Sequence, residues 1–202
     1  MTQKAGLVTL HLLEGIHYDS WIIFLKMHIA GGVMALALGP FQFSKRIQAK
    51  RRIHRFIGKV YIFSILLGGL AGFYVSSTAL GGVISMVGFL CLNILWLYTT
   101  YIGYKTARKK KIELHQRWML RSYALTFAGV TLRLWTILLT FLFADVTKLI
   151  NPTAVPSDFL SVYRLIAWIC WIPNLFVIEL YIRFRKQKSA GKSSAVSLTR
   201  LL

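Results

Sequence analysis

Five long apolar stretches, separated by short segments that carry most of the charge, constrain this chain more than any other feature. Each stretch is long enough for a helix to cross the hydrocarbon core of a bilayer, which takes about 20 apolar residues. Because unpaired backbone groups are not tolerated in lipid, helices are the expected form. We therefore expect an all-α, polytopic membrane protein with a bundle of about five transmembrane helices. The stretches are 21–43, 56–79, 83–104, 118–143 and 159–182.

Positively charged side chains are concentrated in three segments of the chain. Of 25 Lys and Arg residues, seven lie in 44–59, seven in 105–121 and six in 183–202. Loops rich in Lys and Arg stay on the cytoplasmic side of a membrane. The pattern predicts an amino terminus outside the cell, cytoplasmic loops at 44–55 and 105–113, and a cytoplasmic carboxyl terminus. It also favours contact with anionic lipid headgroups and argues against nucleic-acid binding.

The chain is expected to have three parts. Residues 1–20 form an N-terminal outer-side segment, 21–182 the transmembrane bundle, and 183–202 a basic cytoplasmic tail whose Ser-rich composition predicts disorder. Proline should kink or stop two of the helices, at Pro40 and at Pro173. The carbonyls that Pro173 frees then need other partners.

The fourth stretch keeps a polar line on one helical face, because His115, Ser122 and Gly129 fall seven residues apart. Arg133 lies beside this line at membrane depth. An arginine in the middle of a span costs about +2.5 to +3.5 kcal/mol on insertion scales. We therefore expect Arg133 to be buried in the bundle. There it would serve an outer-side polar pocket together with His28, which lies on a glycine-rich face of 21–43. The alternative is that Arg133 only pairs with backbone carbonyls or with Asp145 or Asp158.

His54 and His115 each stand at the cytoplasmic entrance of an outward-running stretch, so we expect them close together at one depth. Two imidazoles in this arrangement can bind haem iron from both faces, while arginines pair with the propionates. The pattern suggests haem b, with His54 and His115 as iron ligands and Arg55 and Arg121 nearby. Hydrogen bonding within the bundle or contact with lipid headgroups would explain the same histidines.

A quinone is the other cofactor that the polar residues could hold. Its carbonyl oxygens need donors at membrane depth beside apolar walls. His28, Arg133 and the glycine-rich face could provide this setting. The sequence contains no hydrolase set, no metalloprotease motif and no phosphate-binding glycine loop. It also lacks the internal repeat that is typical of many transporters.

Four segments of the chain form recognisable motifs: MHIAGGVMALALGPFQF, HRFIGKVY, HQRWMLRSYALTFAGVTLRLW and WIPNL. Together they resemble domain-of-unknown-function family 2306, a family of bacterial predicted membrane proteins. The resemblance covers roughly residues 27–179 and implies a multi-pass protein of the bacterial inner (plasma) membrane, without assigning a reaction. In placing histidines at the ends of packed helices, the chain is also distantly similar in architecture to di-haem cytochromes b.

Two functional hypotheses follow from these residues. The first is an integral membrane protein that binds haem b or a quinone and takes part in membrane electron transfer. The alternative is a non-catalytic scaffold or accessory subunit of a larger membrane complex, acting with other proteins or as a homo-oligomer. A Soret band in the purified protein would separate the haem hypothesis from the scaffold.

Overall fold

The computed structural model describes residues 18–143 and 157–199, and over these residues it contains helices and turns but no strand. Five segments are long and apolar enough to cross a membrane: Asp19–Phe43, Arg51–Ser77, Val83–Arg108, Ile112–Leu139 and Leu160–Lys188. The expected all-α bundle with five spans is thus confirmed. The helices are α2 (Tyr18–Phe43), α3 (Lys45–Ala49), α4 (Arg51–Ser77), α5 (Val83–Arg108), α6 (Ile112–Thr126), α7 (Ala128–Phe143), α9 (Ser157–Ile169) and α10 (Ile172–Thr199).

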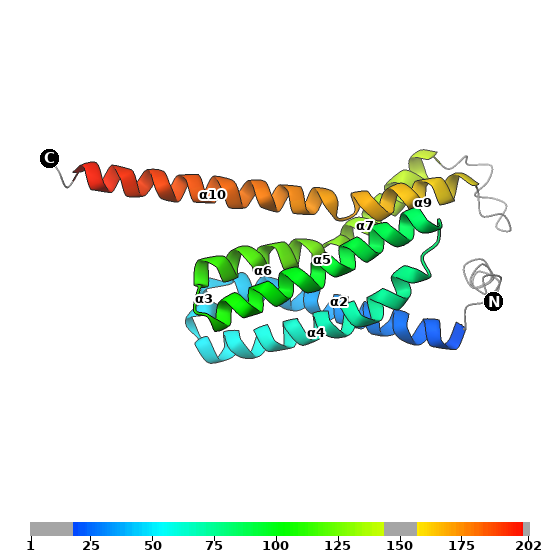
Figure 1. Cartoon of the computed structure of the whole chain (residues 1–202), viewed down its shortest axis with the longest axis horizontal. Coiled ribbons are helices and arrows are strands. Elements are labelled where there is room, and N and C mark those ends of the chain that lie inside the picture. The colour runs from blue at the N-terminus through cyan, green and yellow to red at the C-terminus, as the bar shows by residue number, and fades with distance from the viewer. Residues whose placement is uncertain (1–17, 144–156, 200–202) are drawn as a thin grey trace.

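The connections between the helices define two ends of the bundle. The short helix α3 and the turn between α5 and α6 lie together at one end, which we call the basic end (Figure 1). The start of α2, the α4–α5 turn and the pair α7 and α9 lie toward the opposite end. The α4–α5 turn relies on glycine, because Gly81 and Gly82 have φ values of 87° and 73°. Arg164 of α9 donates a hydrogen bond to the Gly81 carbonyl at 2.9 Å.

Glycines bring α2 and α4 into backbone contact. A Cβ placed on Gly31 would lie 2.4 Å from the Ser64 carbonyl oxygen and 2.7 Å from the Gly68 nitrogen. A Cβ on Gly32 would meet nothing within 4 Å. The expected glycine-rich face of the first span is therefore a helix-packing face, and Gly31 is the residue that makes the close approach possible.

Pro40 was expected to kink or stop the first span. It does not stop α2, because the helix continues to Phe43. Proline lacks an N–H, so the carbonyl four residues earlier, that of Leu36, loses its usual donor. The Tyr123 hydroxyl of α6 donates to this carbonyl at 3.3 Å. The Tyr123 ring also fits against Gly39, where a Cβ would lie 2.0 Å from a ring carbon. A side chain from another helix thus replaces the missing backbone donor.

The fourth and the fifth membrane span are each divided into two helices, and hydrogen bonds connect the two points of division. Phe127 separates α6 from α7, and the turn at Cys170 and Trp171 separates α9 from α10 just before Pro173. The Cys170 carbonyl accepts hydrogen bonds from the Thr131 hydroxyl at 2.5 Å and the Asn174 amide at 3.1 Å. A kink was expected at Pro173, and the structure has a break between two helices just before it. The Thr131 and Asn174 side chains satisfy the Cys170 carbonyl at this break.

The polar connections are more helical than the sequence predicted. The basic segment 44–55 contains α3 and already includes the first turn of α4. The tail from residue 183 was expected to be disordered, but α10 continues as a helix to Thr199, beyond the end of the bundle (Figure 1). Extending an existing helix needs no new nucleus, and Lys, Arg and Ala are good helix formers. The outer segment up to residue 17 and the loop 144–156 lie outside the described residues.

Candidate functional site

His28 is held by the backbone of α4. Its Nδ1 lies 2.7 Å from the Gly68 carbonyl oxygen. A carbonyl can only accept a hydrogen bond, so Nδ1 carries the proton and donates. In the neutral ring Nε2 then keeps its lone pair, as an acceptor or a ligand atom. The Trp96 ring lies edge-on to the imidazole, with 6.3 Å between ring centroids.

Asn93 of α5 reaches the same part of α4 from the other side. Its amide nitrogen donates to the Gly69 carbonyl at 2.8 Å, and its Oδ1 is buried without a partner among the described residues. A Cβ on Gly72 would lie 2.7 Å from Asn93 Oδ1 and 2.9 Å from His28 Nδ1. The absence of a side chain at Gly72 therefore lets both polar groups approach α4 at one level.

A cavity of about 380 Å³ opens beside these residues, toward the end of the bundle opposite the basic end. α2 packs mainly on α4 and α7 mainly on α9, and the cavity lies between α2 and α7. Its walls are mostly apolar, and polar atoms come from a few side chains and from backbone. The polar and aromatic side chains on its wall are Trp21, His28, Ser76, Thr78, Phe89, Asn93, Trp96, Thr126 and Tyr163.

A chain of buried hydroxyl groups begins at the cavity wall. Trp96 Nε1 donates to Thr126 Oγ1 at 2.8 Å, and the Tyr61 hydroxyl lies 3.3 Å from Thr126 and 3.0 Å from Ser122 Oγ. Ser122 Oγ is in turn 2.7 Å from Thr100 Oγ1. These contacts join α4, α5 and α6 inside the bundle.

His54 lies in the first turn of α4 and His115 in the first turn of α6, both at the basic end, and the two imidazoles are close enough to interact electrostatically. Their common depth is supported by the residues seven further along, because Tyr61 and Ser122 are in hydrogen-bond contact. His115 Nδ1 donates to the Gly103 carbonyl at 2.8 Å, which leaves its Nε2 with the lone pair. His54 Nδ1 is buried and makes no hydrogen bond within the described part of the chain.

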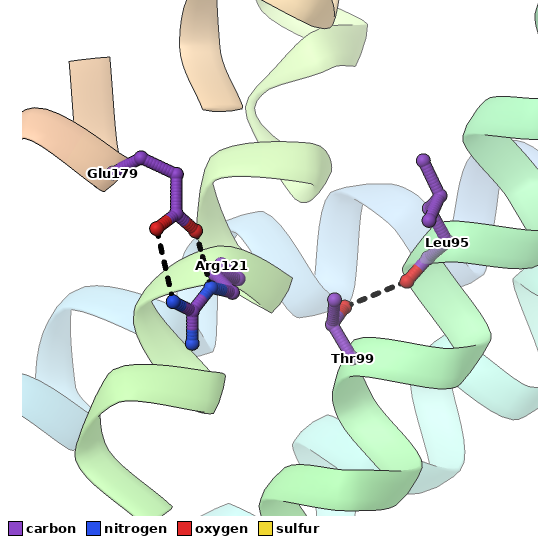
Figure 2. Close-up of polar contacts among 4 residues, drawn as sticks. All are labelled: Leu95, Thr99, Arg121 and Glu179. Atoms are coloured by element: carbon purple, nitrogen blue, oxygen red, sulfur yellow. Dashed lines mark hydrogen bonds and ion pairs between the residues drawn. The ribbon is translucent and has the colours of Figure 1, made fainter. Parts of the chain in front are cut away.

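Arg55 and Arg121 were expected beside the His54–His115 pair, but the contacts recorded for arginines at this end are with other groups. Arg121 forms a two-pronged ion pair with Glu179 of α10 (Figure 2), and its guanidinium lies 4.7 Å from the centre of the Trp118 ring. Arg117 pairs with Glu113 on its own helix. Arg55 is exposed at the start of α4. Arg121 therefore ties α6 to α10 rather than pointing to the histidines.

Arg133 is exposed, which corrects the expectation that it is buried in the bundle. Its Nη1 donates to the Gly129 carbonyl of the preceding turn at 2.6 Å. The guanidinium thus folds back along α7 and satisfies one of its donors there. Gly129 itself lines the cavity, and Arg133 lies near enough to His28 to interact with it electrostatically. Arg133 thus stands near the cavity without contributing to its wall.

Comparison with known families assigns the chain. Residues 25–182 match the family model described as Predicted membrane protein (DUF2306). The chain belongs to the DUF2306 family. No curated protein and no solved structure matches it. DUF2306 membership and the five spans together establish a multi-pass integral membrane protein. The matched region includes the cavity residues from His28 onward and the His54–His115 pair.

Asn93 is the main residue of this candidate site that was not predicted from the sequence. It lies ten residues after the start of α5, and His28 lies ten residues after the start of α2 at the same end of the bundle. At about 1.5 Å per residue the two side chains have similar depth. A comparison of depths would therefore have placed Asn93 beside His28. Thr126 and Trp96 could not be found this way, because their role depends on side-chain packing.

Proposed function

We propose that the protein binds the headgroup of a membrane quinol in the cavity between α2 and α7. The observation that carries this proposal is that two side chains on the cavity wall, His28 and Asn93, each keep an acceptor atom, Nε2 and Oδ1. Asn93 Oδ1 is buried without a partner among the described residues. A buried acceptor that lacks a donor costs about 1–3 kcal/mol, so a ligand that supplies hydroxyl donors gains that free energy.

The donor pattern favours the reduced form over the oxidised form of such a ligand. A quinol offers two O–H donors, whereas a quinone offers only carbonyl acceptors. His28 Nδ1 already donates to the Gly68 carbonyl, and one of the two Asn93 amide hydrogens is donated to the Gly69 carbonyl. The two side chains therefore keep two acceptors, His28 Nε2 and Asn93 Oδ1, against one remaining N–H donor. This refines the sequence-based hypothesis, in which His28 and Arg133 acted as donors to quinone oxygens.

The size and position of the cavity agree with a single ring that has an apolar tail. Its volume of about 380 Å³ is at the lower end for small-molecule sites, which run from roughly 300 to 1,000 Å³. An opening between α2 and α7 would face the bilayer, where the tail of such a lipid resides. A quinol carries two electrons and two protons, so binding it would give the protein a role in membrane electron transfer.

Equilibrium binding of a short-tailed quinol to the purified protein under anaerobic conditions tests this function. Trp21 and Trp96 line the cavity, so quenching of tryptophan fluorescence reports occupancy. We expect His28→Phe and Asn93→Leu each to weaken binding by about fivefold or more, the value of one hydrogen bond near 1 kcal/mol. Thr99→Val should leave binding unchanged, because Thr99 is buried and its hydroxyl donates hydrogen bonds only within its own helix. Equal affinity in all four proteins would refute the site.

A second candidate is haem b between His54 and His115 at the basic end. The observation in its favour is the His115–Gly103 hydrogen bond, since axial histidines commonly donate Nδ1–H to a carbonyl and bind the metal through Nε2. Arg121 is not available for a propionate unless it leaves Glu179. Purified protein supplied with haem should then show a Soret band that His54→Ala and His115→Ala each abolish.

The remaining parts of the hypothesis concern location and partners. We propose a bacterial inner membrane with the basic end in the cytoplasm, because that end carries the clustered Lys and Arg residues. Anionic lipid headgroups would contact this end. If the protein binds neither quinol nor haem, the alternative is a scaffold or accessory subunit, whose partners or self-association would be detected by crosslinking in native membranes.

A further inference from the structure

The buried hydroxyl chain has the composition of a proton path. It consists of Thr126, Tyr61, Ser122 and Thr100, with oxygen–oxygen distances of 3.3, 3.0 and 2.7 Å along the chain. Each hydroxyl can accept one hydrogen bond while it donates another. Tyr61 is 1% exposed and Ser122 is fully buried, so lipid and bulk water are excluded from its centre.

Two of the hydroxyls have a second acceptor beside them. Thr126 Oγ1 lies 2.9 Å from the Ser122 carbonyl, and Thr100 Oγ1 lies 2.7 Å from the Trp96 carbonyl. A hydroxyl with two acceptors in reach can turn from one to the other. Such turning is what a chain needs in order to return to its starting orientation after a proton has passed.

The two ends of the chain lie at the two polar regions of the molecule. Thr126 is on the cavity wall. At the other end, Thr100 is one helical turn from Gly103, whose carbonyl accepts the hydrogen bond from His115. On α6, Met119 lies on the same face as His115 and Ser122 and between them. It packs on Gly103, where a Cβ would lie 2.6 Å from its sulfur atom. The flexible Met119 side chain therefore stands where the hydroxyl chain would have to continue to His115.

We propose that this chain conducts protons between the cavity and His115 at the basic end. Each oxygen accepts one proton and passes another to the next oxygen, and rotation of the hydroxyls resets the chain. No atom is consumed and no electron moves. The path needs no quinol, because its members belong to the protein alone; bound quinol would be one source of protons at the cavity.

Proton flux into vesicles tests this assignment. The protein is reconstituted into potassium-loaded vesicles that contain a pH-sensitive dye, and valinomycin then imposes a membrane potential. We expect wild-type protein to carry protons, and Tyr61→Phe and Thr100→Val each to reduce the flux to that of vesicles without protein. Tyr61→Phe keeps the ring, and Thr100→Val keeps the shape, so both changes remove the hydroxyl alone.

Thr99→Val is the matched control. Thr99 is the buried neighbour of Thr100, but its hydroxyl donates only to its own helix, at the Leu95 carbonyl (Figure 2) and at the Trp96 carbonyl. This variant should conduct like the wild type. The proposal is overturned if wild-type vesicles take up protons no faster than empty ones, if folded Tyr61→Phe and Thr100→Val still conduct, or if Thr99→Val loses the flux equally. If one variant fails to fold, the other decides.

Met119→Ser tests the end of the path at His115. Placing a hydroxyl between Ser122 and His115 should raise the flux above the wild-type level. A folded Met119→Ser protein whose flux is no higher would contradict this exit. The measurement uses no quinol, so a protein that binds quinol without conducting protons, or conducts without binding, separates this path from the proposed ligand site.

Discussion

Single glycines determine how closely the helices approach, and through that approach they create the candidate site. Gly68 and Gly69 present carbonyls to His28 and Asn93, and Gly72 leaves room for both side chains. A glycine within a helix lowers the stability of the fold by about 0.5–1 kcal/mol relative to alanine, because it loses more conformational freedom on folding. Here that cost is offset by close packing and by two interhelical hydrogen bonds.

Gly31→Ala should destabilise the protein, whereas Gly32→Ala should not. The new Cβ at Gly31 would collide with α4 backbone, and the overpacking should cost about 1–3 kcal/mol. At Gly32 the new Cβ meets open space, and better helix propensity should raise stability by up to about 1 kcal/mol. Thermal unfolding of both variants in one detergent is the measurement. Similar unfolding temperatures for the two would contradict the α2–α4 packing.

At the scale of elements, helices continue or stop according to which side chains are available to satisfy their carbonyls. α2 continues past Pro40 because Tyr123 reaches the Leu36 carbonyl. α9 and α10 instead separate before Pro173, where Thr131 and Asn174 hold the Cys170 carbonyl. The outcome at each proline is thus decided by a neighbouring helix, which the local sequence does not reveal.

Tyr123→Phe should lower the free energy of unfolding by about 0.5–1.5 kcal/mol, the value of one hydrogen bond. The phenyl ring would keep its packing against Gly39. In a Pro40→Ala background the Leu36 carbonyl regains a backbone donor, so the same substitution should cost less. A double-mutant cycle of the two changes measures this coupling. Strictly additive effects would show that the hydroxyl is not replacing the missing donor.

Glu179→Gln should destabilise the contact between α6 and α10. The Arg121–Glu179 pair makes two hydrogen bonds and is partly buried, with side chains 20% and 37% exposed. Hydrogen bonds to charged groups contribute about 1.5–3 kcal/mol. Glu113→Gln is the control, since Glu113 is 79% exposed in its pair with Arg117 and such pairs contribute about 0–1 kcal/mol. Unfolding in detergent should rank the two variants in this order.

The sequence was sufficient to predict the five membrane spans. Hydropathy located all five, because each span must match the membrane thickness. It could not locate the break at Phe127, which coincides with no proline in that span. The cost argument favoured burial of Arg133 in the bundle, whereas the structure shows the alternative, a hydrogen bond from its guanidinium to a backbone carbonyl, that of Gly129 in its own helix.

The roles of His28 and Asn93 depended on three-dimensional information. The sequence predicted that His28 lies on a glycine-rich face. It did not predict the hydrogen bond from His28 Nδ1 to the Gly68 carbonyl, and this bond leaves Nε2 as the acceptor. Asn93 is a polar residue in an apolar helix, but only the packed structure shows that its Oδ1 is unsatisfied among the described residues.

For the whole molecule, the basic end should face the cytoplasm. A cysteine at Lys109, in the turn between α5 and α6, reports its side; Lys110 is less suitable because its φ is 57°. In a background without Cys91 and Cys170, a membrane-impermeant maleimide should label Lys109→Cys only after intact cells are opened. Labelling of Lys109→Cys in intact cells would show that the basic end faces outward and would contradict this prediction.

The central claim is that the cavity recognises hydroxyl donors through His28 and Asn93. It is tested most directly by comparing the dissociation constants of a short-tailed quinol and its dimethyl ether, which has the same ring without O–H donors. We expect the quinol to bind about tenfold or more tightly, from two hydrogen bonds near 1 kcal/mol each, and this advantage to shrink in Asn93→Leu. Equal affinity, or tighter binding of the ether by the wild-type protein, would contradict the account.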